Sequence, residues 1–434
     1  MTRALKNTAL LFAERIVTMA FVFASSIAIA RFGGVELFGN YSAITAFAAL
    51  FLPFVALGLN NVATAVFLRY SKHSHFYLRV IFRIRFLGAV CTLGAASILA
   101  WLVLPENQLL AIILVTLQSF TVMHVIEFFF IAQEKVQVTQ RVRMAVISAI
   151  SLAKILVAWC FPSLIALVFL SGLECVFIAA GYYFCYRHIR EVGSINYKAR
   201  LKRQRKVAAI LLGRSKWLVI SAFAASVYLK IDQLMLMSFL GAEHVAHYAA
   251  AAKLSEFWYV FPVLLANVLT AKLHRSKKQA RQLYSQNIQG LLALMVILSL
   301  VIIIFTYLVA PLLVALIFGE QYQQASEILR IHIFACIFVF QRAVLSKWII
   351  FERLYHLSAV THGFGAVANV ALNTWLIPMY AGVGAAWATV AAYAVSSLLA
   401  LLFYRAGRVF AWSMLKAMCL NFFYWRYIRG LFRN

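Results

Sequence analysis

The sequence predicts an all-helical integral membrane protein with twelve spanning helices in two similar six-helix bundles. Three observations predict this fold class: long apolar runs, basic residues confined to alternate connections, and a turn that recurs at about half the chain length. Of the 434 residues, 64% are hydrophobic and 12% are charged, whereas a soluble domain carries about 25% charged residues. Most of the apolar runs reach about 20 residues, which is enough for a helix to cross a hydrocarbon core of ~30 Å.

The apolar runs define the expected spans. They cover about residues 8–30, 42–67, 86–104, 109–131, 144–161, 164–186, 217–240, 245–269, 288–317, 327–350, 357–377 and 384–404. The expected organisation is a first bundle at 1–186, a basic linker at 187–216, a second bundle at 217–404 and a basic amphipathic tail at 405–434. The tail mixes aromatic residues with arginine, which is typical of a helix that lies on a membrane surface.

The basic residues indicate the orientation. Of the 40 Lys and Arg residues, 32 lie in alternate connections and in the terminal segments, and the intervening connections hold none apart from Arg31 at a span edge. By the positive-inside rule, both termini and the linker are cytoplasmic. A nucleic-acid-binding patch has no reason to alternate in this way, so the net charge of +27 does not indicate nucleic acid. The charge also suits anionic lipid headgroups.

A repeated turn relates the two halves. The stretch 228–256 contains Asp232, the only Asp in the chain, and it echoes the stretch that begins at Ala30. Four pairs share an offset of 207 residues: Gly34 with Gly241, Glu36 with Glu243, Tyr41 with Tyr248 and Ala43 with Ala250. We expect a polar turn at 241–244. Since six spans separate the repeats, both halves enter the membrane in the same direction and form a parallel repeat, as in many transporters.

Charged residues inside the spans mark the candidate site. A charge at the bilayer centre costs about 2.5–3.5 kcal/mol on insertion scales, so such residues face the bundle or a water-filled cavity. The cations that we expect in a cavity for an anionic substrate are Arg15, Lys154, Lys230, Lys253 and Arg342. The candidates for coupling transport to H+ or Na+ are Asp232 and Glu174.

Several of these charges also have a structural interpretation. Lys253 and Glu256 are three apart and can pair along one helix, and Arg15 can reach the membrane interface through its long side chain. Lys230 and Asp232 point in nearly opposite directions on a helix, so each needs its own partner. Further expectations are that Lys347 is an anchor at the interface, that Arg330 pairs with Glu327, and that His332 and His362 serve in packing or hydrogen bonding.

The chain lacks the signatures of an enzyme or a metal site. Its six Cys residues are scattered without a CxxC pair, the lone Asp forbids a DxD motif, and neither HExxH nor a Walker motif is present. A membrane glycan polymerase or ligase also needs a large extramembrane loop, and the outer connections are about ten residues or fewer, a length that forms a turn. A cation or drug antiporter remains an alternative, although it requires acids and here the cations inside the spans outnumber them.

Three segments carry a resemblance to a known family. They are the two glycine–tyrosine turns, the turn LIFGEQYQQASEILRI, and NVALNTWLIPMYAGVGAAWATVAAY, which follows an N-x-x-L-N…I-P-x-Y…G-A-A-x-A-T pattern from Asn369 to Thr389. Over nearly the whole chain the sequence resembles the MOP superfamily, and within it the Wzx-type polysaccharide flippases of O-antigen (lipopolysaccharide) synthesis. The peptidoglycan lipid II flippases usually have fourteen spans, so the twelve spans expected here argue against that group.

The resemblance implies a function and a location. Flippases of this type move undecaprenyl-diphosphate-linked oligosaccharides from the inner to the outer leaflet of the bacterial inner (cytoplasmic) membrane. The implied mechanism is alternating access through a V-shaped cavity between the bundles. The implied partners are the lipid bilayer, the lipid-linked glycan and other polysaccharide-assembly proteins. The resemblance implies neither an enzyme activity nor a cofactor other than a coupling ion.

Overall fold

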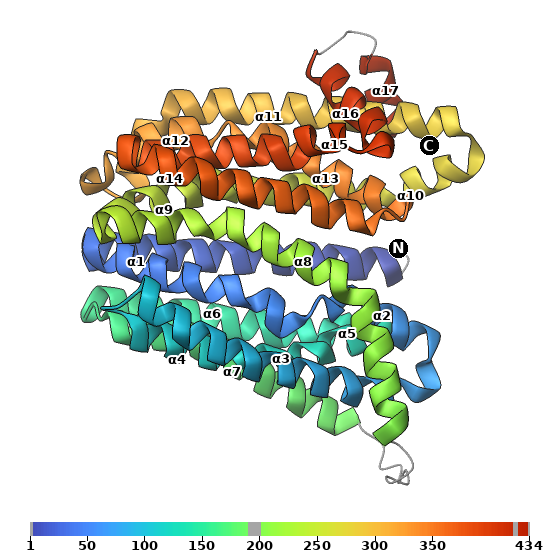
Figure 1. The fold of residues 1–434 in the computed structure, drawn as a ribbon, viewed down its shortest axis with the longest axis horizontal. Coiled ribbons are helices and arrows are strands. Elements are labelled where there is room, and N and C mark those ends of the chain that lie inside the picture. Colours follow the sequence, from blue (N-terminus) through green and yellow to red (C-terminus); the bar gives the residue numbers. More distant parts are fainter. Residues whose placement is uncertain (1–2, 190–200, 420–423, 433–434) are drawn as a thin grey trace. The chain divides into compact units, whose positions relative to one another are not determined.

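The computed structural model describes residues 3–189, 201–419 and 424–432, and all regular secondary structure in these ranges is helical (Figure 1). By contacts the chain divides into two compact units, Met1–Ser226 and Val227–Asn434. The centre of the predicted linker, 190–200, lies outside the described residues. On either side of it the chain is helical, because α7 continues to Ile189 and α8 begins at Leu201.

The first unit is built from long apolar helices with short breaks. They are α1 (Arg3–Ala56), α2 (Leu59–Arg69), η1 (Ser71–His73), α3 (Ser74–Val103), α4 (Gln108–Gln118), η2 (Ser119–His124), α5 (Val125–Ala132), α6 (Val136–Cys160) and α7 (Leu164–Ile189). Helix α8 (Leu201–Leu240) runs from this unit into the second. Aromatic residues fill part of the core, where Phe67, Phe129 and Tyr182 are buried with aliphatic side chains.

The second unit repeats this construction. Its helices are α9 (Ala242–Glu256), η4 (Phe257–Tyr259), α10 (Val260–Gln279), α11 (Arg281–Ile317), η5 (Glu320–Tyr322), α12 (Ala325–His332), α13 (Ala335–Phe351), α14 (Tyr355–Ala394), the π-helical turn η6 (Val395–Leu399), α15 (Ala400–Leu402), α16 (Arg405–Met418) and α17 (Tyr424–Phe432). A large apolar cluster joins α10, α11, α13 and the two C-terminal helices.

The two paired glycines adopt the same backbone conformation. Gly34 has φ 80° and ψ 173°, and Gly241 has φ 86° and ψ −175°. Only glycine enters this region readily, and no atom lies within 4 Å of the position that a Cβ would occupy at either residue. The backbone angle, and not crowding, therefore explains why glycine recurs at the offset of 207. The second turn is shorter than predicted, because α8 ends at Leu240 and α9 begins at Ala242.

The described residues contain fewer separate spans than the twelve expected. Nine helices are long and apolar enough to cross a membrane, or ten if α12 and α13, which meet at 41°, form one span. Two of them, Glu14–Ala56 and Tyr355–Leu402, have 43 and 48 residues, about twice what a ~30 Å core requires. Each takes in two predicted spans and contains one non-helical residue, Gly34 or Ala381. The twelve-span count and the cytoplasmic termini stay predictions.

The tail differs from the single surface helix that the sequence predicts. Helices α16 and α17 bury apolar residues, among them Phe410, Met414 and Leu431, in the same cluster as residues of α11 and α13. A Cβ on Gly290 of α11 would lie 2.8 Å from the carbonyl carbon of Tyr427, so α17 approaches α11 at a position without a side chain. Protein, and not only lipid, therefore covers the apolar face of the tail.

Candidate functional site

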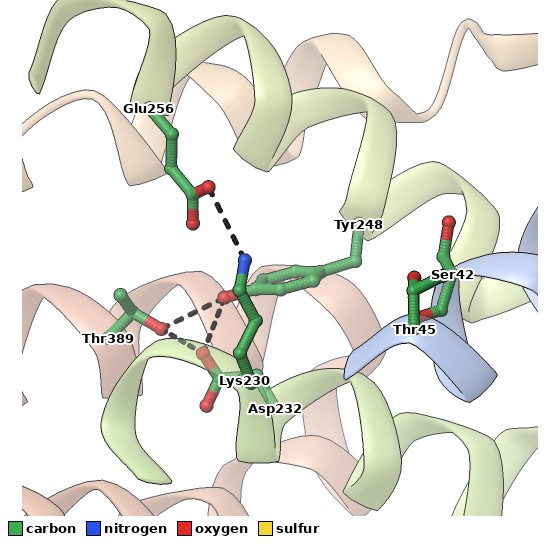
Figure 2. Close-up of polar contacts among 7 residues, drawn as sticks. All are labelled: Ser42, Thr45, Lys230, Asp232, Tyr248, Glu256 and Thr389. Atoms are coloured by element: carbon green, nitrogen blue, oxygen red, sulfur yellow. Dashed lines mark hydrogen bonds and ion pairs between the residues drawn. The ribbon is translucent and has the colours of Figure 1, made fainter. Parts of the chain in front are cut away.

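The second unit buries its carboxylate among neutral hydrogen-bond donors. Asp232 on α8 is 1% exposed. Its Oδ2 accepts hydrogen bonds of 2.6 Å from the hydroxyls of Tyr248 and Thr389, as Figure 2 shows, and its Oδ1 accepts one from the amide of Asn373. Asn373 and Thr389 lie on opposite sides of the break at Ala381, so both arms of α14 contribute to this site.

This cluster contains an acidic side chain that has no cationic partner among the described residues. All three donors to the carboxylate are neutral, and none of the ion pairs among the described residues includes Asp232. Asn373 Nδ2 also donates to Asn369 Oδ1 at 3.1 Å, while Asn373 Oδ1 is buried and accepts no hydrogen bond. A buried charge needs hydrogen bonds or a counter-charge, and here neutral hydrogen bonds stabilise it. The result is a small, oxygen-rich site built around one carboxyl group.

Lys230 forms a separate ion pair. Its Nζ lies 3.5 Å from Oε2 of Glu256 on α9, and each side chain is 29% exposed (Figure 2). Lys230 and Asp232 thus have different partners although they are two residues apart. Lys253 is half-buried on α9, one turn before Glu256. The pair links α8 to α9 beyond the turn at Gly241.

Arg342 on α13 is held by neutral groups. Its Nη2 donates to Thr361 Oγ1 at 3.1 Å, and its Nη1 donates to the carbonyl of Ser396 in the π-helical turn η6. No carboxylate of the described residues forms an ion pair with it. A guanidinium carries five N–H donors, so further acceptors can be accommodated.

The first unit pairs two residues to which the sequence assigned separate roles. Lys154 of α6 is 7% exposed, and its Nζ donates to Glu174 Oε2 of α7 at 3.2 Å. Close to it, the hydroxyl of Tyr41 lies 2.9 Å from Ser171 Oγ, also on α7. Tyr41 and Tyr248, which share the offset of 207, therefore both hydrogen-bond to a residue of another helix.

Comparison with known proteins decides the family. The sequence model of the family described as "Polysaccharide biosynthesis protein" matches residues 4–269, more than half of the chain. The chain belongs to this family. A sequence comparison with curated proteins finds no match.

Three solved structures share the fold of this family member. The lipid II flippase MurJ in an inward closed conformation has a TM-score of 0.67 at 14% identity, over 98% of this chain and 91% of MurJ. An inward-facing multidrug resistance MATE family transporter of the MOP superfamily gives 0.60 at 13%, over 92% and 96%. A MOP superfamily transporter from Pyrococcus furiosus, described as having a binding pocket of reverse polarity, gives 0.57 at 12%, over 94% and 96%. The chain therefore has the multi-pass helical fold of MOP transporters.

The structure also reveals a charged network that the sequence analysis missed. Arg143 on α6 lies 3.7 Å from Glu14 of α1 and 3.6 Å from Glu127 of α5. Arg85 on α3 is 3% exposed and donates to the carbonyl of Ala56 at 3.3 Å. Both arginines were assigned to connections because the expected spans started at 86 and 144, whereas α3 and α6 begin earlier. Glu14 and Glu127 are acids inside apolar spans, and this feature of the sequence could have indicated the network.

The remaining predicted residues have local roles. Arg15 is exposed and forms no part of the Arg143 network. Lys347 donates to Asn267 Oδ1 at 2.5 Å. Arg330 donates to the carbonyl of Tyr307 and lies 5.5 Å from its ring centroid, so the expected pair with Glu327 is wrong, because a neighbouring helix offers both an acceptor and an aromatic face.

The two histidines serve in packing and hydrogen bonding, as expected. His362 Nδ1 lies 2.8 Å from the hydroxyl of Tyr228, and the two rings are stacked. His332 is 2% exposed and meets the ring of Tyr248 edge-on at 5.8 Å. Neither residue belongs to a group of His, Cys, Asp or Glu that could hold a metal ion within the described part of the chain.

Proposed function

We propose that this protein is a flippase for an undecaprenyl-diphosphate-linked oligosaccharide. It moves the substrate from the inner to the outer leaflet of the bacterial cytoplasmic membrane by alternating access. The family, whose description is polysaccharide biosynthesis, supports the glycan. The fold shared with a lipid II flippase supports a lipid-linked substrate. Its partners are the bilayer, the glycan lipid and other polysaccharide-assembly proteins.

The main observation behind this proposal is the set of neutral hydrogen-bond partners around Arg342. This residue is a cation inside a predicted span that has hydrogen bonds to neutral groups but no carboxylate partner among the described residues. An intramembrane charge is costly and is normally functional, and a planar guanidinium fork matches phosphate oxygens in two-point geometry. A lipid diphosphate supplies the missing negative charge.

The paired lysines have a second role in the proposal. Lys154 and Lys230 each contact one carboxylate, at 3.2 and 3.5 Å, and an ammonium has three donors. Each can therefore bind a phosphate oxygen while it keeps or exchanges its carboxylate. An inside-negative membrane potential favours outward movement of an anion by about 2.3 kcal/mol per charge per 100 mV. Lys253 and Arg15 complete the set of candidate cations.

Asp232 is the proposed coupling residue. None of the ion pairs among the described residues includes its carboxylate, and the side-chain carbonyl oxygen of the neighbouring Asn373 is buried and accepts no hydrogen bond. Such a site accommodates one small cation, H+ or Na+, and loading it removes the negative charge. Glu174, which pairs with Lys154, is the corresponding candidate in the first unit.

Complementation tests the function in cells. The protein is expressed in a bacterium that lacks its O-antigen flippase, and both surface glycan and the lipid-linked intermediate are measured. We expect restored glycan and loss of the accumulated intermediate. Arg342→Gln abolishes this effect, whereas Lys347→Gln, which removes a cation from the same helix near its predicted inner end, retains it. A mismatch between the glycan and the protein also prevents complementation, so a liposome assay with labelled polyprenyl-diphosphate sugar gives the decisive result.

A cation or drug antiporter is the second candidate, favoured by Asp232 and by the fold shared with a MATE transporter. A buried carboxylate without a cationic partner is what a pump for organic cations requires. The two functions separate in one experiment. Efflux of a cationic dye from cells, together with no movement of the labelled lipid in liposomes, would overturn the flippase proposal and establish the antiporter.

A further inference from the structure

The last helix, α17, borders a cavity at one end of the second unit. The cavity has a volume of ≈ 540 Å³ and lies among α10, the first part of α11 and α17, which Figure 1 shows at the same end of that unit. Its volume falls in the range of about 300–1,000 Å³ that is usual for small-molecule sites. The lining residues are Lys272, Arg275, Ser276 and Gln279 of α10, Leu283, Gln286 and Asn287 of α11, and Arg426, Tyr427, Gly430 and Leu431 of α17.

The lining is strongly cationic. Three of the eleven residues that line it, Lys272, Arg275 and Arg426, are basic and none is acidic. Lys272 Nζ donates to the carbonyl of Gly430 at 2.9 Å, which fixes the end of α17 against α10. Arg275 of α10 and Arg426 of α17 are exposed, so the cavity has a guanidinium group on each of two helices. A guanidinium fork matches the oxygens of a phosphate.

Other residues of the lining carry hydroxyl and amide groups. Ser276 and Asn287 are 2% and 5% exposed, and Gln279 and Gln286 carry further amides. Ser276 Oγ donates to the carbonyl of Leu273 at 2.9 Å, so its lone pairs remain to accept a hydrogen bond. The cavity is larger than one phosphate requires, and these groups match the hydroxyls of a substituent on that phosphate.

Exposed apolar residues of the two C-terminal helices indicate that the ligand of the cavity comes from the membrane. Val409 and Trp412 of α16 are 72% and 60% exposed, and Trp425 of α17 is 49% exposed. Tryptophan and basic residues together are typical of the membrane–water interface. The connection between α10 and α11 is one of the basic ones that the charge distribution assigns to the cytoplasmic side, where anionic lipids attract Lys and Arg.

We propose that this cavity binds the phosphate-bearing headgroup of an anionic membrane phospholipid and thereby fixes α17 on α11. The site is separate from the intramembrane residues of the proposed transport function and does not depend on that function. Arg275 and Arg426 bind the phosphate, and the amides of α10 and α11 bind the hydroxyls of the headgroup.

The test measures lipid binding to the full-length purified protein in detergent, with phosphatidylglycerol and phosphatidylcholine as probes. Phosphatidylglycerol raises the unfolding temperature of the wild type and phosphatidylcholine does not. Because each cation near an anionic surface contributes about a fivefold factor in affinity, Arg275→Gln weakens binding about fivefold and the double variant with Arg426→Gln about 30-fold. Lys278→Gln is the matched control, since Lys278 is an exposed cation on α10 outside the lining.

A second variant separates the cavity from the charges. Gly290→Leu keeps every cation but places a side chain where the Tyr427 backbone lies, so it displaces α17 and also abolishes the effect of phosphatidylglycerol. The Arg→Lys double variant keeps the positive charge but loses both guanidinium forks, so it binds more weakly than the wild type and more tightly than the Gln double variant, and it shows that the fold tolerates substitution at both positions. An equal response of the Gln double variant and the wild type would overturn the proposal. Protection by inorganic phosphate alone, as strong as that by phosphatidylglycerol, would overturn the lipid assignment and identify a free phosphate compound as the ligand.

Discussion

Replacing Asp232 by Asn removes the carboxylate that Tyr248, Thr389 and Asn373 surround. The size of the side chain stays the same. We expect the variant to fold and to lose the dependence of transport on an ion gradient. The carboxylate accepts three charge-assisted hydrogen bonds, each worth about 1.5–3 kcal/mol, against about 0.5–1.5 kcal/mol for a neutral bond. The difference is about 1 kcal/mol per bond and about 3 kcal/mol for all three.

Neighbouring hydrogen-bond acceptors limit the loss of folding stability to this difference of about 3 kcal/mol. Each donor has a second acceptor close by: the hydroxyl of Tyr248 lies 3.0 Å from Thr389 Oγ1, Thr389 Oγ1 lies 3.0 Å from the carbonyl of Ala385, and Asn373 Nδ2 lies 3.1 Å from Asn369 Oδ1. No donor is left buried without a partner, a situation that would cost about 1–3 kcal/mol more for each group. Removing a buried charge also recovers part of its desolvation cost.

The assay compares wild type, Asp232→Asn and Glu106→Gln in liposomes. Glu106 is an exposed carboxylate of the first unit and serves as the control. Flux of a labelled polyprenyl-diphosphate sugar is measured with and without pH and Na+ gradients, and melting curves check that each variant is folded. We expect the gradient to stimulate the wild type and the control but not Asp232→Asn. A variant that keeps the full gradient response would refute the coupling role, and a variant that does not fold would refute the stability estimate.

Three further predictions concern ion pairing, the arginine fork and the turn. Glu174→Gln destabilises the protein by about 3 kcal/mol because the buried Lys154 loses its partner, Lys154→Gln costs less because Glu174 is partly exposed, and the double variant recovers most of the larger loss; additive unfolding shifts would contradict the pairing. Arg342→Lys keeps the charge but loses the fork, and the loss of one charge-assisted hydrogen bond of at least about 1.5 kcal/mol lowers flux about tenfold; unchanged flux would argue against phosphate binding there. Gly241→Ala costs about 1–3 kcal/mol because its φ of 86° and ψ of −175° lie in a region that essentially only glycine adopts. By contrast, Gly94→Ala in α3, where the new Cβ also meets no atom, stabilises by about 0.5–1 kcal/mol; equal effects in thermal unfolding would contradict the backbone argument.

The sequence predicted what depends on local composition. Apolar runs identified the helices, because burial in lipid demands them, and the recurring glycines identified two turns that have the same backbone angles. The helical period also indicated that Lys230 and Asp232 need different partners. Each of these features is determined by residues that are close together in the chain.

The partners themselves could not be predicted. Asp232 binds residues 141 and 157 positions away, and helical periodicity states which face a residue occupies but not which helix packs against it. The network of Arg143 with Glu14 and Glu127 was missed for the same reason, combined with span limits drawn too late in the chain. The two-helix tail was missed because an amphipathic pattern does not distinguish a protein surface from a membrane surface.

Because α17 approaches Gly290 so closely, the position of α17 depends on the absence of a side chain at residue 290. A backbone-to-backbone approach of this kind permits no alternative residue without movement of the whole helix, unlike an apolar contact, which tolerates exchange among Leu, Ile and Met. Relatives with a larger residue at this position should therefore carry their tail elsewhere or lack it. The presence of glycine here in related sequences then becomes a simple marker for which relatives have the docked tail and the cationic cavity beneath it.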